Sequence, residues 1–351
     1  MVTTLHTQTN TTVRLARRPS GMPEDNDWSI ADEPVERPDP GEVLVETLYV
    51  SVDPAMRAWV SGAQTYRAPV NPGDIMPAAA AGRVIESRDA ALEVGDLVTG
   101  DLGVQRYAVR PARVLERITA PVDALPEHLG VLGIAGITAY IGLHDIGRLK
   151  PGDTLVVSGA AGAVGSAAGQ IARAFGARVI GIAGGEEKCR YVVDDLGFDA
   201  CLDHRDPELA SALSAAAPKG IDVYFDNVGG DVLEAALDNL ARGARIILCG
   251  AVSQYNSERM AGPSNYMELL IKRASMTGFV VFDHRDRFDQ ARAELSALLS
   301  RGELRADLHI RQGLHQFPTA LRDLFTGTNR GKVLLKTTTN NADRAENGAT
   351  R

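Results

Sequence analysis

A glycine-rich turn lies between an apolar run and a helical run, and it is the segment of this sequence with the clearest chemical use. Thr154–Ser158 is apolar and largely β-branched, Gly159–Ser166 reads G-A-A-G-A-V-G-S, and a helical pattern follows to Phe175. Such a turn exposes backbone amides at a helix N-terminus, where the pyrophosphate of a dinucleotide can bind. Gly162 would let the backbone touch the phosphates, and Gly165 would let the helix lie close on the strand. The alternative is a plain strand–turn–helix, which the further strand after this helix disfavours.

The residues after the next strand indicate which dinucleotide would bind. An NAD site usually carries Asp or Glu about 20 residues after the turn, where it holds the ribose 2′-hydroxyl. Here the strand ends at Ile182–Gly185 without an acid, Lys188 and then Arg190 follow, and His204 and Arg205 end the strand after it. Cations at this place favour the 2′-phosphate of NADPH. The acidic pair Glu186–Glu187 suits the first turn of a helix, and the alternative for Lys188 is an ordinary surface position on that helix.

The elements that must position this turn form an alternating pattern. Residues 132–143 are helical in pattern, and apolar strand-like runs then recur with helical runs between them. Alternation of this kind predicts βαβ units, and therefore a parallel sheet with helices on both faces. The expected strands start at Thr154, Arg178, Ala200, Asp222, Arg245 and Met276.

The first part of the chain has a different pattern. From about residue 13 to residue 120, short β-like runs alternate with Gly and Pro, as at Glu42–Val50, Ala81–Glu86 and Gly95–Gly100. Several strands at such spacing predict a small barrel or sandwich. Another strand is expected at Gly331–Lys336, and the polar residues 1–12 and 337–351 are expected to be loose tails.

Composition bounds the class of protein. The chain has 351 residues, 44% of them hydrophobic and 23% charged, which predicts about two globular domains. The net charge of −8 disfavours a nucleic-acid or anionic-membrane binder. The basic run Arg14–Arg18 is expected to be a solvated leader. No apolar run approaches the roughly 18 residues of a membrane span.

Cysteine usage predicts the compartment. Cys189, Cys201 and Cys249 are odd in number and separated in the sequence, so they suggest neither a disulfide framework nor a C-x-x-C metal site. Few cysteines and the lack of a signal peptide predict the reducing cytoplasm. Five histidines have no partner pattern and are expected to be structural: His128, His144, His284, His309 and His315.

Taken together, the motifs match a known family. The chain resembles the zinc-independent medium-chain dehydrogenase/reductases, within them the prostaglandin reductase and leukotriene hydroxydehydrogenase group, and especially its bacterial curcumin-reductase branch. The matching blocks span nearly the whole chain, and their specificity comes from the set rather than from any one of them. They are Ser51–Arg57, Gly136–Tyr140, Gly142–Gly147, Ser158–Ser166, Ala183–Arg190, Leu196–Asp199, Tyr224–Gly230, Cys249–Asn256 and Asn329–Val333.

The resemblance implies an α/β protein with a GroES-like β-barrel domain and a Rossmann domain with a doubly wound parallel sheet. The implied boundaries are residues 1–133 for the first part of the GroES-like catalytic domain and 134–309 for the NADP-binding domain. Residues 310–351 would return to the catalytic domain and end in a disordered tail. The active site would lie in the cleft between the domains, and the protein would be a cytoplasmic homodimer.

The resemblance also implies cofactor-binding positions. The pyrophosphate would lie on Gly162, Ala163, Val164 and Gly165, and the 2′-phosphate on Lys188, with His204 where animal members often carry Tyr. The remaining implied contacts are with Asn227, Cys249, Gly250, Ser253, Tyr255, Phe279, Val280, Val281 and Asn329.

The substrate pocket departs from the family pattern at one place. Family members often have Tyr after Asp-Pro in the pocket wall, whereas this chain has Ala55, so extra room is expected and the family's substrate preference does not carry over. Met56 is interpreted as pocket lining, with plain core as the alternative, and Tyr66 and Tyr266 could also face the pocket. Residues 1–127 contain no Cys and only His6, so the three ligands of a catalytic zinc site cannot be assembled there.

The implied reaction is reduction of the C=C bond of α,β-unsaturated ketones and aldehydes. Hydride from NADPH would add to the β-carbon, and a donor must then stabilise the charge on the carbonyl oxygen. Without zinc, the candidate donor is Tyr255, acting with the cofactor's ribose hydroxyl, and the α-carbon would take its proton from water or from Tyr255. The alternative is that Tyr255 merely packs against the cofactor. Two other functions stay open: a quinone oxidoreductase and a non-catalytic NADPH-binding protein.

Overall fold

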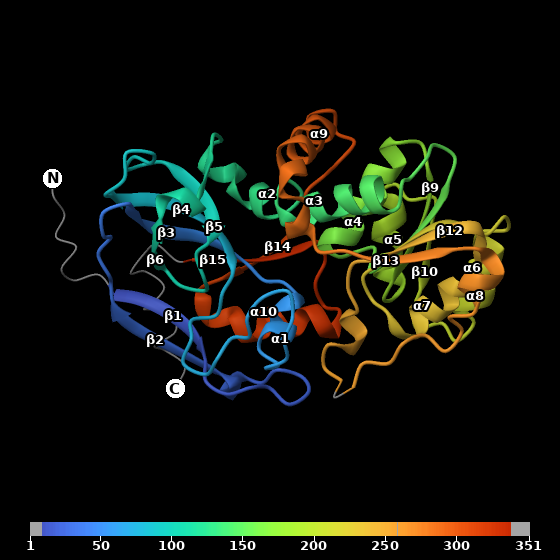
Figure 1. Cartoon of the computed structure of the whole chain (residues 1–351), viewed down its shortest axis with the longest axis horizontal. Helices are drawn as coiled ribbons and strands as arrows, with labels where there is room; N and C mark the ends of the chain where they lie inside the picture. The colour runs from blue at the N-terminus through green and yellow to red at the C-terminus, as the bar shows by residue number, and fades with distance from the viewer. Residues whose placement is uncertain (1–8, 258, 338–351) are drawn as a thin grey trace. The chain divides into compact units, whose positions relative to one another are not determined.

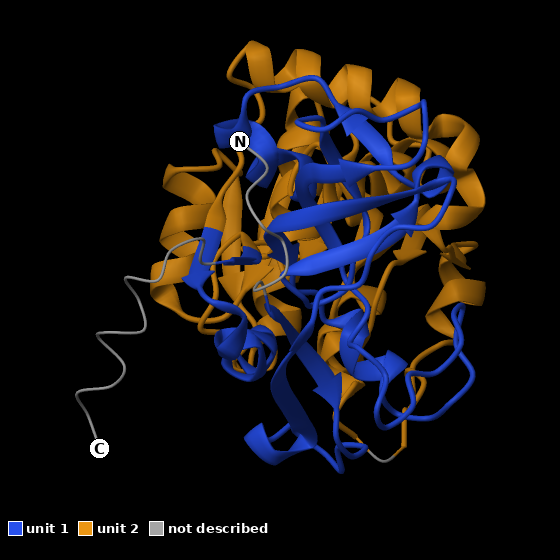
Figure 2. Cartoon of the chain, turned by 90° about the vertical axis from the view of Figure 1, so that its left-hand side faces the viewer, with its two compact units in different colours: residues 1–129, 309–324, 333–351 blue, residues 130–308, 325–332 orange. Residues whose placement is uncertain are grey.

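The computed structural model describes residues 9–257 and 259–337, in two compact units (Figure 2). The first unit comprises residues 1–129, 309–324 and 333–351, and the second comprises residues 130–308 and 325–332. His6 and the outer parts of both expected tails, residues 1–8 and 338–351, lie outside the described residues. The short segment 325–332 belongs to the second unit, although the sequence placed it with the first.

The first unit is built on a seven-stranded sheet and a two-stranded sheet. β3 (Glu42–Ser51) is central: its start pairs with β6 (Tyr107–Pro111), its end pairs with β15 (Lys332–Lys336), and its other side pairs with β4 (Ala79–Ser87), all antiparallel. β15 thus returns to the N-terminal strands. The other strands are β1 (Thr9–Leu15), β2 (Trp28–Pro34), β5 (Leu97–Asp101), β7 (Glu116–Ile118) and β14 (Leu308–Gln312), and the helices are α1 (Ala55–Trp59), α2 (Leu125–Leu129) and α10 (Phe317–Thr326).

The basic run at the start of the chain was wrongly predicted to be a leader. Residues 9–15 form β1, which pairs antiparallel with β2 along its length, so residues 9–12 are not a tail either. Arg14 makes a two-bond ion pair with Glu33 at 2.7 and 2.8 Å, and Arg18 donates to the carbonyl of Val70 at 2.8 Å. These bonds hold the arginines against the first unit. The strand itself is held because side chains of β1 such as Val13 and Leu15 are buried in the core.

The second unit has a six-stranded parallel sheet in the order β10-β9-β8-β11-β12-β13. Figure 1 labels β9, β10, β12 and β13 of this sheet. Since β8 is the first of these strands in the chain, the order is that of a doubly wound nucleotide-binding sheet, and it reverses between β8 and β11. The predicted α/β fold class is therefore confirmed. The strands are β8 (Thr154–Ser158), β9 (Arg178–Ala183), β10 (Ala200–Asp203), β11 (Ile221–Asp226), β12 (Leu240–Leu248) and β13 (Ser275–Gly278).

Helices cover both faces of this sheet. Successive residues of a strand point to opposite sides, so each strand contributes to an apolar core on each face. Leu155 and Val157 of β8 pack in one apolar core, and Val156 packs in the other. The first core also takes side chains of α3, α4, α5 and α9, and the second takes those of α6 and α7. The helices are α3 (Ile134–Ile141), α4 (Ala163–Ala174), α5 (Glu186–Asp194), α6 (Leu209–Ala216), α7 (Gly230–Leu237), α8 (Glu268–Lys272) and α9 (Phe288–Ser300).

Among the described residues, no single helix is both long enough and apolar enough to cross a membrane. Residues 122–129 and 134–146 reach that length and composition when they are taken together across a bend.

Candidate functional site

The glycine-rich turn lies at the carboxyl end of β8, where the strand order reverses. Gly159 has a φ of +62°, and Gly162 caps the N-terminus of α4 with extended backbone angles. A β-carbon on Gly165 would lie 2.3 Å from the carbonyl oxygen of Gly159, so a side chain there would force the helix away from the turn. The turn thus places the N-terminus of α4 at the crevice where doubly wound folds bind their ligands.

A buried carboxylate joins the ends of β8 and β11. Asp226 is 1% exposed, and its Oδ1 accepts hydrogen bonds from Ser158 Oγ at 2.9 Å and Tyr224 at 3.1 Å. The amides of Val228 and Gly229 donate to the same oxygen. Burial raises the pKa of Asp226, and the surrounding donors oppose that shift. Asp226 stands in the Tyr224–Gly230 block, but no pattern in the sequence indicates a buried carboxylate there.

Asn227 is held against the turn by this network. Its side-chain amide donates to the carbonyl of Ser158 at 2.8 Å, and its backbone N–H donates to Ser158 Oγ at 2.8 Å. The predicted cofactor residue Asn227 therefore lies beside the glycine-rich turn, at the start of the loop that follows β11.

The loop after β12 joins the same edge of the sheet. The amides of Cys249 and Gly250 donate to the carbonyl of Asp226 at 2.9 and 3.1 Å, and Ser253 Oγ donates to the carbonyl of Val228 at 2.7 Å. The Tyr255 hydroxyl accepts the N–H of Ala251 at 3.3 Å. These bonds bring the predicted stretch 249–255 onto the loop that follows β11.

The segment 329–332 reaches the turn from the C-terminal part of the chain. The N–H of Gly331 donates to the carbonyl of Ala161 at 2.8 Å, and Gly331 forms a parallel bridge with Gly162. Asn329 is 7% exposed in this segment. Of the predicted stretch 279–281, Phe279 and Val280 are partly buried, and Val281 packs in the core of the second unit.

Basic side chains gather where β9 and β10 end. A β-carbon on Gly184 would lie 2.9 Å from His204 Nε2 and 3.4 Å from the Arg205 guanidinium, so these side chains lie over the end of β9. Lys188 is half-buried in the first turn of α5. Burial lowers the pKa of Lys188, and the positive charge of Arg205 adds to that shift. A cluster of this kind is suited to bind a phosphate dianion.

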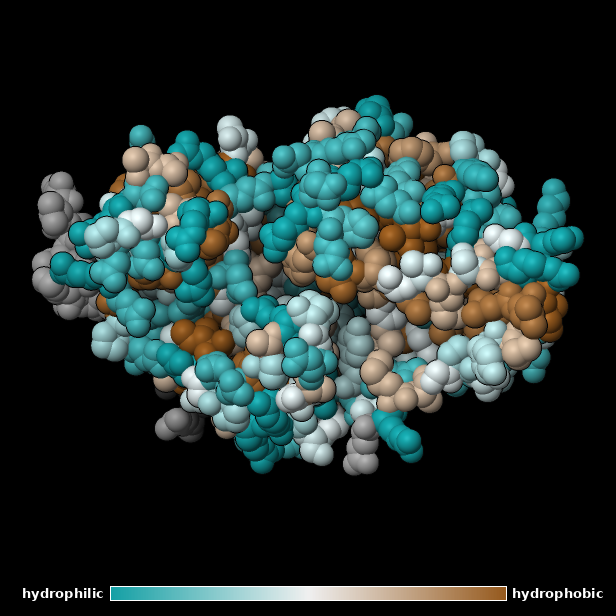
Figure 3. All heavy atoms as spheres, in the orientation of Figure 1, coloured by the Kyte–Doolittle hydropathy of each residue, from teal (hydrophilic) through white to brown (hydrophobic). Residues whose placement is uncertain are grey.

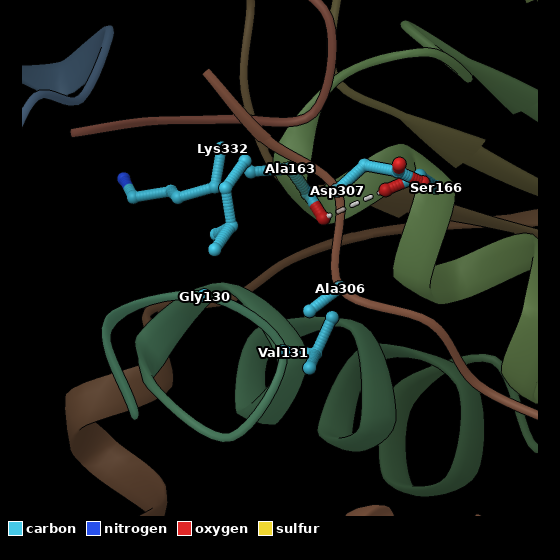
Figure 4. Close-up of a pocket in the computed structure, with 8 residues that line it drawn as sticks. Gly130, Val131, Ala163, Ser166, Ala306, Asp307 and Lys332 are labelled. Carbon is cyan, nitrogen blue, oxygen red and sulfur yellow. Dashed lines mark hydrogen bonds between the residues drawn. The ribbon is translucent and has the colours of Figure 1, made fainter. Parts of the chain in front are cut away.

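A small pocket opens beside the N-terminus of α4 (Figure 4). Ala163, which the sequence placed at the pyrophosphate, lies on its wall, and Ser166 Oγ donates to the Ala163 carbonyl at 3.3 Å. The pocket is lined by Gly130, Val131, Ala163, Ser166, Ala306, Asp307, Leu308 and Lys332, all from the second unit.

The predicted substrate-pocket residues are divided between the units. Ala55 and Met56 begin α1 of the first unit; Ala55 is partly buried, and Met56 is fully buried, which favours its alternative as a core side chain. Tyr66 of the same unit is exposed, and its hydroxyl accepts a hydrogen bond from Trp59 Nε1 at 3.0 Å. Tyr266 belongs to the second unit and is 60% exposed.

Across residues 9–257 and 259–337, no three His, Cys, Asp or Glu side chains are grouped so that they could hold a metal ion. The donor set of a catalytic zinc site is therefore not found in this part of the chain.

Comparisons with known proteins agree with this architecture. A family model for the N-terminal domain of oxidoreductase matches residues 11–118, and a model for zinc-binding dehydrogenase matches residues 163–297. NADPH-dependent curcumin reductase of Escherichia coli (strain K12) is 39% identical over 92% of this chain and 95% of its own length. 2-Alkenal reductase (NADP(+)-dependent) of Nicotiana tabacum is 36% identical over 93% of this chain and 97% of its own length.

A solved structure extends the comparison to three dimensions. CurA of Vibrio vulnificus in complex with NADPH is 40% identical, with a TM-score of 0.90 over 94% of this chain and 100% of the other. The predicted family is thereby confirmed. The chain belongs to the zinc-independent medium-chain dehydrogenase/reductases, in the group that includes the curcumin and prostaglandin reductases.

Proposed function

We propose that this protein uses NADPH to reduce the C=C bond of α,β-unsaturated ketones and aldehydes. The names of its relatives support both the cofactor and the reaction class. The structural observation that carries the proposal is the edge of the parallel sheet at β8, β11 and β12. The N-terminus of α4, where phosphates can bind, lies at the end of β8, and the loop after β12 carries the Tyr255 hydroxyl. Hydrogen bonds join the ends of β8 and β11 at this edge.

The residues of this edge fit a dinucleotide. The N-terminus of α4, at residues 162–165, would bind the pyrophosphate, and Lys188 with His204 would bind the 2′-phosphate. Asn227, Asn329 and the stretches 249–255 and 279–281 would line the rest of the cofactor. When bound, NADPH supplies the hydride that adds to the β-carbon of the substrate.

Tyr255 is proposed as the hydrogen-bond donor to the substrate carbonyl oxygen, where negative charge grows as the β-carbon gains hydride. Its hydroxyl oxygen accepts the N–H of Ala251 at 3.3 Å. A phenolic hydroxyl can also donate a hydrogen bond. The α-carbon then takes a proton from water or from Tyr255, which completes the saturated carbonyl product.

The substrate preference is proposed to differ from that of relatives with a bulkier pocket wall. Ala55 offers only a methyl group at the start of α1, so the site would admit broader enones, with Tyr66 and Tyr266 as further candidates for the wall.

The three cysteines are free thiols, which supports a reducing compartment such as the cytoplasm.

We also propose a homodimer that forms through the second unit. β13 ends the six-stranded sheet, so one edge of this strand is available to a second copy. Apolar side chains gather over α8 (Figure 3). The exposed ones in and beside α8 are Tyr266, Met267, Leu270 and Ile271, with exposed fractions of 48–68%. An open strand edge beside an apolar patch is suited to a two-fold interface between identical chains.

The reaction is tested with purified protein, NADPH and a panel of an enal, an enone, curcumin and a quinone, in the presence of a metal chelator. We expect NADPH consumption with the conjugated carbonyl compounds and a product that has gained two hydrogen atoms across the C=C bond. Bound NADPH that reduces none of them would refute the proposal, and faster turnover of the quinone would assign the protein to quinone reduction instead.

A further inference from the structure

Two thiols that are separate in the sequence meet in the second unit. Cys189 lies in the first turn of α5 and Cys201 lies in β10, and the Cys201 thiol donates to the Cys189 sulfur at an Sγ–Sγ distance of 3.1 Å. Both are free, and both residues are partly exposed. A disulfide has an S–S distance of about 2.05 Å, so the two sulfurs are about 1 Å from bonding distance.

The thiol pair lies on α5 and β10, next to the basic side chains of Lys188, His204 and Arg205. Lys188 directly precedes Cys189 on α5, and β10 ends at Asp203, two residues after Cys201. The Asp203 carboxylate accepts the N–H of Gly185, at the start of α5, and the N–H of Arg205, each at 3.0 Å. A bond between the sulfurs would therefore pull on the two elements whose spacing sets the positions of Lys188 and Arg205.

The surroundings of the two thiols slow the first step of their oxidation. Burial raises the pKa of both thiols, so the protonated forms predominate at neutral pH. Thiolates are the reactive forms, so the first attack on an oxidant is slow. The second step is fast, because the partner sulfur is already in contact and the reaction is intramolecular.

We propose that Cys189 and Cys201 form an oxidation site that takes a small hydroperoxide, and that the disulfide weakens binding of the 2′-phosphate. One sulfur attacks a peroxide oxygen to give a sulfenic acid and releases water or an alcohol. The other sulfur displaces the hydroxyl as water, which forms the S–S bond; the thiols lose two electrons and the peroxide gains them. This inference rests on the proposed NADPH site.

The test uses the full-length protein, reduced and then treated with hydrogen peroxide. Peptide mass spectrometry should find a Cys189–Cys201 cross-link that has lost two hydrogen atoms and regains them with a thiol reductant. The dissociation constant for NADPH should rise about fivefold on oxidation, whereas that for NADH should not change, because NADH has no 2′-phosphate. Cys189→Ser and Cys201→Ser are matched controls: neither should cross-link, and neither should lose NADPH affinity after peroxide.

Two results would overturn the inference. One is peroxide treatment that leaves the two thiols unlinked, and the other is a cross-link that leaves the ratio of NADPH to NADH affinity unchanged. Both are separate from the fate of the proposed function, which depends on whether the reduced protein binds NADPH and reduces a conjugated carbonyl compound.

Discussion

The hydroxyl of Ser158 donates a hydrogen bond to the buried carboxylate of Asp226 at 2.9 Å, and this bond joins the ends of β8 and β11. The same hydroxyl oxygen accepts the backbone N–H of Asn227. Ser158 therefore fixes the spacing between the glycine-rich turn and the loop after β11. The pair holds the crevice in shape before any ligand enters it.

Replacing this serine should loosen both strands. Ser158→Ala leaves the Asn227 N–H without its acceptor and removes one donor from Asp226, and such a loss in a buried site costs about 1–3 kcal/mol of unfolding free energy. Chemical denaturation measures it, and NADPH titration should show weaker binding. Ser300→Ala is the matched control, because the Ser300 hydroxyl bonds to an exposed helix carbonyl. Equal stability of the two variants would refute the role of Ser158.

Removing the ammonium at the start of α5 should change cofactor preference. Lys188→Ala should weaken NADPH binding about 10- to 100-fold and leave NADH binding unaltered, because a charge-assisted bond to phosphate is worth about 1.5–3 kcal/mol. Fluorescence titration with both cofactors measures the ratio. Arg190→Ala is the control: Arg190 is an exposed cation of the same helix, paired with Glu186. If both variants lost NADPH affinity alike, the effect would be general charge rather than a phosphate site.

The sequence predicts the second unit well for a physical reason. Buried parallel strands are near-continuous apolar runs, so five of the six predicted starts agree with the structure to within one residue. β12 is the exception: it starts at Leu240 rather than Arg245, because Arg242 and Gly243 are exposed and break the apolar pattern. The glycine-rich turn is predictable for a similar reason, since its function depends on consecutive residues.

What the sequence does not predict is contact between distant residues. Asp226 and Ser158 are 68 residues apart, and Cys189 and Cys201 meet because α5 packs against β10. The prediction of a leader at the basic run 14–18 is wrong because Val13 and Leu15 alternate with polar neighbours, which is a strand pattern.

Tyr255→Phe should separate catalysis from binding. If the hydroxyl stabilises the growing oxyanion, kcat should fall about 100- to 1000-fold, as expected for loss of one such donor. NADPH affinity should change little, because the ring remains. Steady-state kinetics and cofactor titration measure the two effects, with Tyr49→Phe, a partly buried tyrosine of β3 in the first unit, as the control. A weaker cofactor affinity with unchanged kcat would show that Tyr255 only holds the cofactor.

His144 should make the second unit sensitive to acid. It is held between the rings of Tyr140 and Phe175, at centroid distances of 4.5 and 4.3 Å, and its Nε2 is buried without a hydrogen-bond partner among the described residues. Burial lowers its pKa below 6.5, with Asp145 opposing and Arg287 assisting that shift. Below about pH 6.5 His144 binds a proton more readily in the unfolded chain than in the folded chain. The contribution of neutral His144 to the free energy of unfolding is therefore fully present above that pH and decreases as the pH falls.

The comparison for His144 is His144→Phe, which keeps an aromatic ring in place and does not titrate. Denaturation of both proteins between about pH 7.5 and about pH 5.5 should show a smaller loss of unfolding free energy for the variant. Parallel pH profiles would mean that another group is responsible for the acid sensitivity.

A charge on α8 should prevent association of two chains. Leu270 is 68% exposed, and in the proposed homodimer it would be covered by the partner copy. Leu270→Glu would place a carboxylate in that interface, where burial of an unpaired charge is strongly unfavourable. The mass from light scattering should therefore shift from dimer to monomer. Val94→Glu changes an equally exposed valine (66%) in the first unit and should leave the mass unaltered. If Leu270→Glu remained a dimer, or if the unmodified chain were a monomer, the interface would not lie at α8 and β13.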